Sequence, residues 1–272
     1  MKKILCPTDF SDSAQNAIAY AAKLAHSMGA QLTLFNVQSS FENLPLEIIG
    51  TKSSKVKAYE KLLDEQSFEI SRTFKISCYA EVISTTASLS KTIAFKASGY
   101  DLLVMGSNGA DDFIQFFLGS HTYKAVVESN VPALVIPSDC IYSEIKEMVF
   151  AFDYLRERKL PITQLIPFVN ALNARLTVLE VLEEAKSEHM DIELQELQEI
   201  LTNTYGEKIT LRFDTIRSAT IAKSINGYIQ NNQPDALAIC SVHRSFLGKL
   251  FHKSVFKDLS AVLSYPVFVF HE

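Results

Sequence analysis

Residues 101–109 read Asp-Leu-Leu-Val-Met-Gly-Ser-Asn-Gly, and residues 118–120 read Leu-Gly-Ser. The apolar run predicts a buried strand, and the glycines that follow, Gly106, Gly109 and Gly119, have the spacing Gly-x2-Gly-x9-Gly-Ser. Glycine lets the backbone approach an anion closely. A helix that opens after Gly119 and Ser120 directs N–H groups and the positive end of its dipole at that anion. The stretch therefore predicts a strand, a loop that holds phosphate, and a helix.

The chain repeats this pattern in its second half. The counterparts are Asp9 and Asp153, Val37 and Val181, Asp101 and Asp235, and Pro132 and Pro266. The first two pairs are 144 residues apart and the last two 134, so a single deletion of ten residues relates the copies. Copies of about 135 residues indicate tandem domains, because solenoid repeats have periods of about 20–50 residues. We expect the domains to span residues 1–140 and 141–272.

Apolar strand runs alternate with helical patterns in each copy. In the first copy we expect helices over residues 13–29, 43–74, 88–98 and 120–129. Ser11 or Asp12 is the expected N-cap of the first helix, and Gly99 is expected to end the third. In the second helix we expect Val56, Tyr59, Leu62, Leu63 and Phe68 to face inward. This order predicts an α/β fold: two tandem doubly wound parallel five-stranded sheets of the Rossmann-like (HUP) type, with helices on both faces.

Composition excludes several classes of partner and location. The 272 residues carry a net charge of −5, which gives no electrostatic case for nucleic acid. There is no run of 18 apolar residues, and the chain begins too soon with polar residues for a signal peptide, so we expect neither a membrane segment nor a leader. The four cysteines lack metal-ligand spacing, which predicts buried thiols, no metal site and a cytoplasmic protein.

Three features together carry a family resemblance. The glycine spacing, the opening Ile-Leu-Cys-Pro-Thr-Asp-Phe-Ser at residues 4–11 and the closing Val-Pro-Ala-Leu-Val-Ile-Pro at residues 131–137 resemble the universal stress protein family. The resemblance covers the whole chain as two copies. It implies the α/β sheet expected above and, because many members bind such ligands, an adenine nucleotide such as ATP or AMP.

The resemblance also implies roles for residues of the first copy. Asp9 would accept hydrogen bonds from ribose hydroxyls, Val37 would border the adenine, and the glycines would pass under the ribose and phosphates. The implied nucleotide-binding set is Pro7, Thr8, Asp9, Val37, Gly106, Gly109, Gly119, Ser120, His121 and Thr122.

The loop between Gly109 and Gly119 departs from the family pattern. It contains no Lys or Arg, and it contains Asp111 and Asp112. A carboxylate ~4 Å from a phosphate, at an effective dielectric constant near 20, costs on the order of 4 kcal/mol. Nucleotide binding then requires that these carboxylates point outward or that Mg²⁺ is recruited.

The second copy departs further. Cys240, His243 and Lys253 replace the three glycines, and Phe152 replaces Thr8. We therefore expect no nucleotide in the C-terminal domain, which completes a pseudo-dimer; a smaller anion there is left open.

We expect a stress-response protein that acts by binding and not by turnover. No Gly-x4-Gly-Lys-Ser/Thr motif is present, and no general base is apparent, so we expect no catalytic residues and at most slow ATP hydrolysis. By the resemblance, the last strands of the copies, Ala133 to Ile136 and Val267 to Phe270, pair across the domains; a homodimer is left open. The alternatives are a regulatory or scaffold protein with a vestigial pocket and protein partners, and an adenine-nucleotide α-hydrolase of the same fold.

Overall fold

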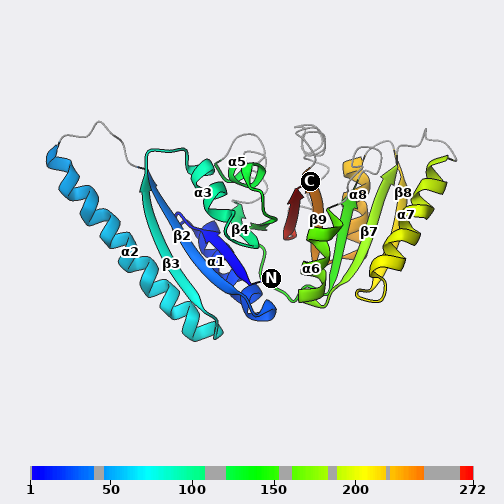
Figure 1. Cartoon of the computed structure of the whole chain (residues 1–272), viewed down its shortest axis with the longest axis horizontal. Helices are drawn as coiled ribbons and strands as arrows, with labels where there is room; N and C mark the ends of the chain where they lie inside the picture. The colour runs from blue at the N-terminus through cyan, green and yellow to red at the C-terminus, as the bar shows by residue number, and fades with distance from the viewer. Residues whose placement is uncertain are drawn as a thin grey trace. The chain divides into compact units, whose positions relative to one another are not determined.

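The computed structural model describes residues 2–39, 46–107, 121–152, 161–182, 189–218, 221–241 and 264–271. The chain divides into two compact units, Met1–Tyr142 and Ser143–Glu272. Each unit alternates strands with helices, as Figure 1 shows. Among the described residues, no helix is both long enough and apolar enough to cross a membrane.

The first unit contains a five-stranded parallel sheet. Its elements are β1 (Lys3–Pro7), α1 (Asp12–Met28), β2 (Gln31–Ser39), α2 (Leu46–Phe74), β3 (Cys78–Thr85), α3 (Leu89–Ala97), β4 (Leu102–Ser107), α5 (His121–Glu128) and β5 (Ala133–Pro137). The strand order is β3-β2-β1-β4-β5, with every pair parallel. The chain winds from β1 toward β3 and then returns to β4 and β5. With right-handed crossovers, this reversal places α1 and α2 on one face and α3 and α5 on the other.

The second unit has the same topology. Its elements are β6 (Glu147–Phe152), α6 (Ile162–Leu172), β7 (Arg175–Leu182), α7 (His189–Tyr205), β8 (Leu211–Arg217), α8 (Ile221–Asn232), β9 (Ala236–Ser241) and β10 (Val267–His271). The strand order is β8-β7-β6-β9-β10, and every pair is parallel. The prediction of two doubly wound parallel sheets is confirmed.

In each unit, an aspartate immediately before the fourth strand along the chain accepts hydrogen bonds from the start of the first strand. Asp101 Oδ2 accepts hydrogen bonds from the backbone N–H groups of Lys2 and Lys3, at 2.7 and 2.9 Å. Asp235 Oδ2 does the same for two N–H groups at the start of β6, at 2.8 Å each. The counterparts found in the sequence thus make the same contacts in space.

Helix α1 begins and ends as the sequence predicts. The Ser11 hydroxyl accepts a hydrogen bond from the N–H of Ala14, which satisfies one of the free donors of the first turn. Gly29 ends the helix with a left-handed φ of 61°, a conformation that glycine adopts at little cost. The face between these caps is buried against the sheet through Ala17, Ile18 and Leu24.

Two expectations about helices are wrong. In α2, Leu62 and Phe68 are 48% and 69% exposed; Leu63 faces inward as expected, and Ile70 is buried in place of Phe68. These buried positions are seven residues apart and therefore share one face. Helix α3 ends at Ala97 with Ser98 in a right-handed conformation, so Gly99 is not its cap.

The segment after β5 packs on α1. The Tyr142 hydroxyl is 3.0 Å from the hydroxyl of Ser27, and the Tyr142 ring meets Tyr20 edge-on at 4.9 Å between centroids. Asn16 Nδ2 donates to the carbonyl oxygens of Pro137 and Cys140, at 2.9 and 3.1 Å. The last residues of the first unit are therefore anchored, although they carry no regular structure.

Candidate functional site

The strand order of the first unit places a candidate site at the carboxyl ends of β1 and β4. These strands are neighbours, with Ile4 and Leu5 opposite Leu102 and Leu103. The chain leaves β1 toward β2 and leaves β4 toward β5, so the strand order reverses between them. Such a switch point opens a crevice between the two connections, where doubly wound sheets bind ligands. Asp9 follows β1, and Gly106 lies near the end of β4.

The turn after β1 presents Asp9 to solvent. Thr8 is buried, its N–H donates to the carbonyl oxygen of Phe35 at 2.8 Å, and its Oγ1 accepts from the N–H of Phe10 at 3.0 Å. Asp9 Oδ1 accepts from the N–H and the hydroxyl of Ser11, at 3.0 and 2.6 Å. No described residue bonds to Asp9 Oδ2, which leaves an acceptor oriented by the rest of the turn.

Gly106 is required by the fold itself. A β-carbon added there would lie 2.4 Å from the carbonyl oxygen of Ser13 and 2.8 Å from its carbonyl carbon, both backbone atoms. The first turn of α1 therefore rests directly on β4. The expected role of Gly106 was close approach to a ligand; the structure gives it this packing role whatever the ligand is.

Val37 is half-buried near the carboxyl end of β2, beside β3. Its neighbour Asn36 is buried and donates through Nδ2 to the carbonyl oxygen of Thr8 at 2.7 Å, while Gln38 Nε2 donates to Asn36 Oδ1. Asn36 thus fixes the turn that carries Asp9. Sequence reasoning gave it no role, although a polar residue in an otherwise apolar strand was the available signal.

The part of the predicted site that would hold phosphate is only partly described. Gly109, Gly119 and Ser120 lie outside the described residues. His121 and Thr122 begin α5, so a helix opens immediately after Ser120, as expected. The structure therefore brings Pro7, Thr8, Asp9, Val37 and Gly106 to one edge of the sheet.

Comparison with known proteins decides the family. The model of the universal stress protein family matches residues 1–137, which is half of the chain. The chain belongs to the universal stress protein family. A universal stress protein of Methanocaldococcus jannaschii is 25% identical over 160 residues, covering 50% of this chain and 94% of that protein.

Solved universal stress proteins share the fold over the whole chain. One from Archaeoglobus fulgidus has a TM-score of 0.72 at 19% identity and covers 99% of this chain and 96% of that one. A structure described as a putative universal stress protein from Pseudomonas aeruginosa has a TM-score of 0.57 at 14% identity, with coverages of 100% and 93%. At these identities the likeness shows the fold alone.

The equivalent edge of the second unit of this universal stress protein has different side chains. Phe152 and Cys240 are buried where the first unit has Thr8 and Gly106, and Glu180 is buried where the first unit has Asn36. Helix α6 begins at Ile162, six residues later than the counterpart of the start of α1. The glycine near the end of β4 thus has no counterpart in β9, which carries a cysteine at that position.

Cys6, Cys78 and Cys140 are not activated. Burial, and secondarily Cys78, raise the pKa of the Cys6 thiol far above its ordinary value. Burial also raises the pKa of Cys78 to about 12 and that of Cys140 to about 11. These thiols are neutral at physiological pH and are poor nucleophiles. Within the described ranges, no group of three or more His, Cys, Asp or Glu side chains is placed to hold a metal ion.

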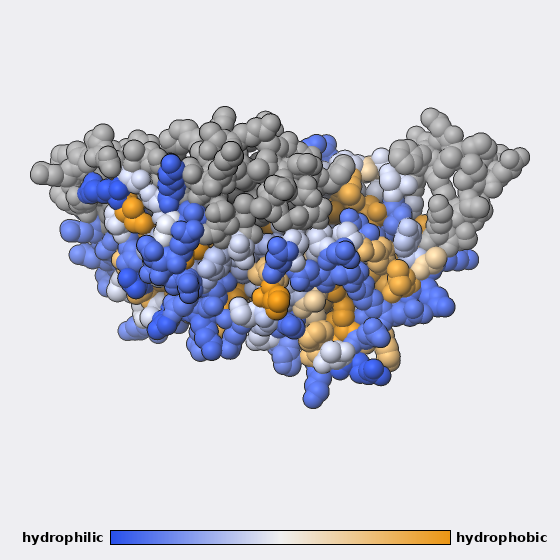
Figure 2. All heavy atoms as spheres, turned by 180° about the vertical axis from the view of Figure 1, so that it is seen from behind, coloured by the Kyte–Doolittle hydropathy of each residue, from blue (hydrophilic) through white to orange (hydrophobic). Residues whose placement is uncertain are grey.

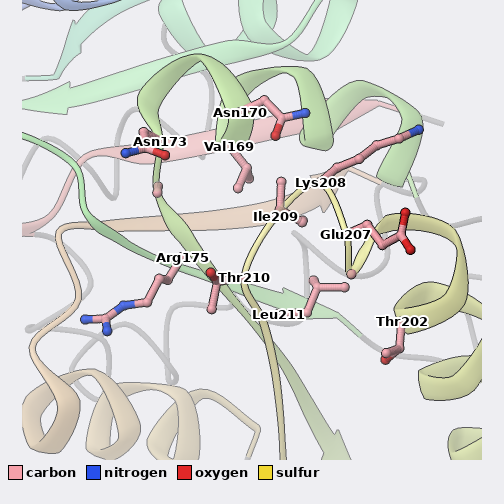
Figure 3. Close-up of a pocket in the computed structure, with 12 residues that line it drawn as sticks. Val169, Asn170, Asn173, Arg175, Thr202, Glu207, Lys208, Ile209, Thr210 and Leu211 are labelled. Atoms are coloured by element: carbon pink, nitrogen blue, oxygen red, sulfur yellow. The ribbon is translucent and has the colours of Figure 1, made fainter.

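A pocket of about 480 Å³ lies at the opposite edge of the second sheet. It is lined by the end of α6, the start of β7 and the connection between α7 and β8, including Val169, Arg175, Lys208 and Thr210. In Figure 3 the charged ends of Arg175 and Lys208 point away from each other and out of the pocket. No charged group converges on its centre, and it lies at the amino ends of the strands, away from the edge where this fold binds ligands.

Proposed function

We propose that this universal stress protein binds an adenine nucleotide, ATP or AMP, in its first unit and acts by binding and not by turnover. The observation that carries the proposal is the position of Asp9. Its carboxylate projects at the switch point between β1 and β4, with Oδ1 committed to Ser11 and Oδ2 free of described partners. A fixed, solvent-facing acceptor of this kind suits the paired hydroxyls of a ribose.

The surrounding residues support the same ligand. Val37 offers an apolar surface beside the turn for a base, and Asn36 holds the turn rigid through the Thr8 carbonyl. Helix α5 begins directly after Gly119 and Ser120, so its first N–H groups are available to a phosphate. Mg²⁺, if recruited, would be held by the phosphates together with Asp111 or Asp112. Because the described residues around the site supply no general base, hydrolysis in this proposal is at most slow.

The second unit is proposed to bind no nucleotide. The Cys240 side chain occupies the position of Gly106, and Phe152 fills the position of Thr8. Glu180 stands where the first unit has Asn36, the residue whose amide bonds the turn that carries Asp9. We propose that this unit, residues 141–272 as a domain, completes an internal pseudo-dimer through its last strand, in a cytoplasmic protein.

The direct test is a nucleotide titration of matched variants. Asp9→Ala should weaken binding of ATP and AMP at least tenfold, since a hydrogen bond to a charged group is worth about 1.5–3 kcal/mol. Asp153→Ala, the counterpart in the second unit, should leave affinity unchanged. An equal loss of nucleotide affinity in both variants, or no loss in either, would contradict the assignment of the site to the first unit.

Exposed apolar side chains favour a second candidate, a regulatory or scaffold protein whose partners are proteins. Phe68 and Phe95 are well exposed on α2 and α3. On the face that Figure 2 shows, hydrophobic side chains also reach the surface among hydrophilic ones. If the wild type binds no adenine nucleotide at millimolar concentration, this second candidate replaces the first.

A further inference from the structure

Phe10 lies in the turn between β1 and α1 with a backbone φ of 68°. This left-handed conformation is unfavourable for a residue with a β-carbon and persists only where surrounding contacts hold it. The Phe10 ring stacks on Tyr59 of α2, with 5.3 Å between centroids and 16° between planes. The strained turn that presents Asp9 is thus in contact with helix α2 through this stack.

Helix α2 contacts the turn after β1 and the start of α1 through few side chains. A pocket of about 690 Å³ separates Phe10 and Gln15 from Leu62, Gln66 and Phe68 of α2. Across it, Gln66 Nε2 donates to Gln15 Oε1 at 2.5 Å. The Phe10–Tyr59 stack and the Gln15–Gln66 hydrogen bond therefore join α2 to the turn and to the start of α1 beside this pocket, while Leu63 and Ile70 hold the buried face of α2 in the core. A substitution in the stack can thus loosen the turn while that buried face stays packed.

We propose that Phe10 is a positioning residue for Asp9, and that its stack on Tyr59 of α2 holds it in that role. This inference rests on the proposed nucleotide function. With Phe10 stacked on Tyr59, Asp9 Oδ1 is bonded to Ser11, and Oδ2 has no partner among the described residues. Loss of the stack releases Phe10 from its left-handed conformation and moves Asp9, so ligand affinity falls. By linkage, ligand bound at Asp9 favours the stacked position of Phe10 to the same extent.

Four variants separate positioning from simple stability. Phe10→Gly keeps the left-handed turn accessible but removes the clamp, and Tyr59→Leu removes the clamp from the side of α2. Both should raise the Kd for adenine nucleotide about tenfold, within the usual range of coupling between sites. Tyr59→Phe keeps the ring and should bind as the wild type does. Tyr79→Leu, which alters an exposed tyrosine on β3, is the control and should also bind normally.

Amide hydrogen exchange of the unliganded full chain gives a readout that does not depend on the ligand. Phe10→Gly and Tyr59→Leu should both raise exchange across residues 9–15, while Tyr59→Phe and Tyr79→Leu should not. Unchanged exchange and unchanged affinity in Tyr59→Leu would overturn the inference. Raised exchange in a protein whose wild type binds no nucleotide supports the positioning role and contradicts the nucleotide proposal instead.

Discussion

The α-carbon of Gly106 lies so close to Ser13 that a β-carbon on it would be 2.4 Å from the Ser13 carbonyl oxygen. Strand β4 and the first turn of α1 are therefore in direct backbone contact at the switch point of the sheet. This contact fixes the distance between the strand end that leads into the glycine loop and the turn that carries Asp9.

Gly106→Ala should destabilise the first unit by about 1–3 kcal/mol, the usual cost of overpacking a site that backbone atoms surround. Calorimetry of the full chain should show a lower Tm. Gly227→Ala is the matched control: this glycine lies inside α8 with nothing within 4 Å of an added β-carbon. Since alanine is the better helix former, that variant should gain about 0.5–1 kcal/mol. A neutral Gly106→Ala would show that the close approach is not maintained in solution.

Asp101→Ala and Asp235→Ala should destabilise their respective units by similar amounts. Each carboxylate accepts two backbone N–H bonds at the start of the first strand of its unit. Because both sites are partly open to water, we expect about 1–2 kcal/mol for each, at the low end for hydrogen bonds to charged groups. Urea denaturation should be monitored by amide hydrogen exchange. Residues 2–7 report on the stability of the first unit, and residues 146–152 report on that of the second. A loss of stability in only one unit would contradict the equivalence of the two repeats.

His271 should make stability depend on pH. Burial lowers the pKa of His271 to about 4, and its Nε2 has no hydrogen-bond partner among the described residues. The folded state thus resists a proton that the unfolded chain accepts near its ordinary pKa of 6.5. The contribution of neutral His271 to folding stability is therefore fully present above about pH 6.5, and it is lost as the pH falls from about 6.5 toward 4.

The matched comparison for this prediction is His271→Leu. Denaturation midpoints between pH 7 and pH 4.5 should fall less in this variant than in the wild type, whereas His26→Asn, at an exposed position in the last turn of α1, should follow the wild type. Parallel curves for His271→Leu and the wild type would show that His271 does not titrate in this way.

Tyr142→Ala should expose the segment after β5 to proteases. The Tyr142 hydroxyl contact with Ser27 and the ring contact with Tyr20 both anchor that segment to α1. Limited proteolysis should cut within residues 138–146 faster in the variant than in the wild type. Tyr142→Phe, which retains the ring, should show an intermediate rate; a rate equal to that of Tyr142→Ala would assign the anchoring to the hydroxyl alone.

The sequence predicted the fold because strand ends and repeat offsets leave strong local signals. Asp101 and Asp235 begin apolar runs 134 residues apart, and the structure gives them identical contacts. The capping residues Ser11 and Gly29 were readable for the same reason, since each type supplies a specific missing hydrogen bond or conformation.

What the sequence did not predict depends on tertiary packing. Leu62 and Leu63 are adjacent and equally apolar, so periodicity alone could not decide that only Leu63 reaches the core. The left-handed conformation of Phe10 is contrary to residue preference and follows from its stack on Tyr59, a residue 49 positions later. The bond from Asn36 to the Thr8 carbonyl joins β2 to the turn after β1 and leaves no trace in the spacing of either segment.

The stoichiometry of nucleotide binding tests most directly whether one unit of the two holds an adenine nucleotide. Equilibrium titration of the purified full chain with ATP and with AMP should saturate at one nucleotide per chain and lose that site in Asp9→Ala. A stoichiometry of two, retained in part by Asp9→Ala, would contradict the assignment of the site to the first unit. No saturable binding at millimolar nucleotide would contradict the proposed function itself.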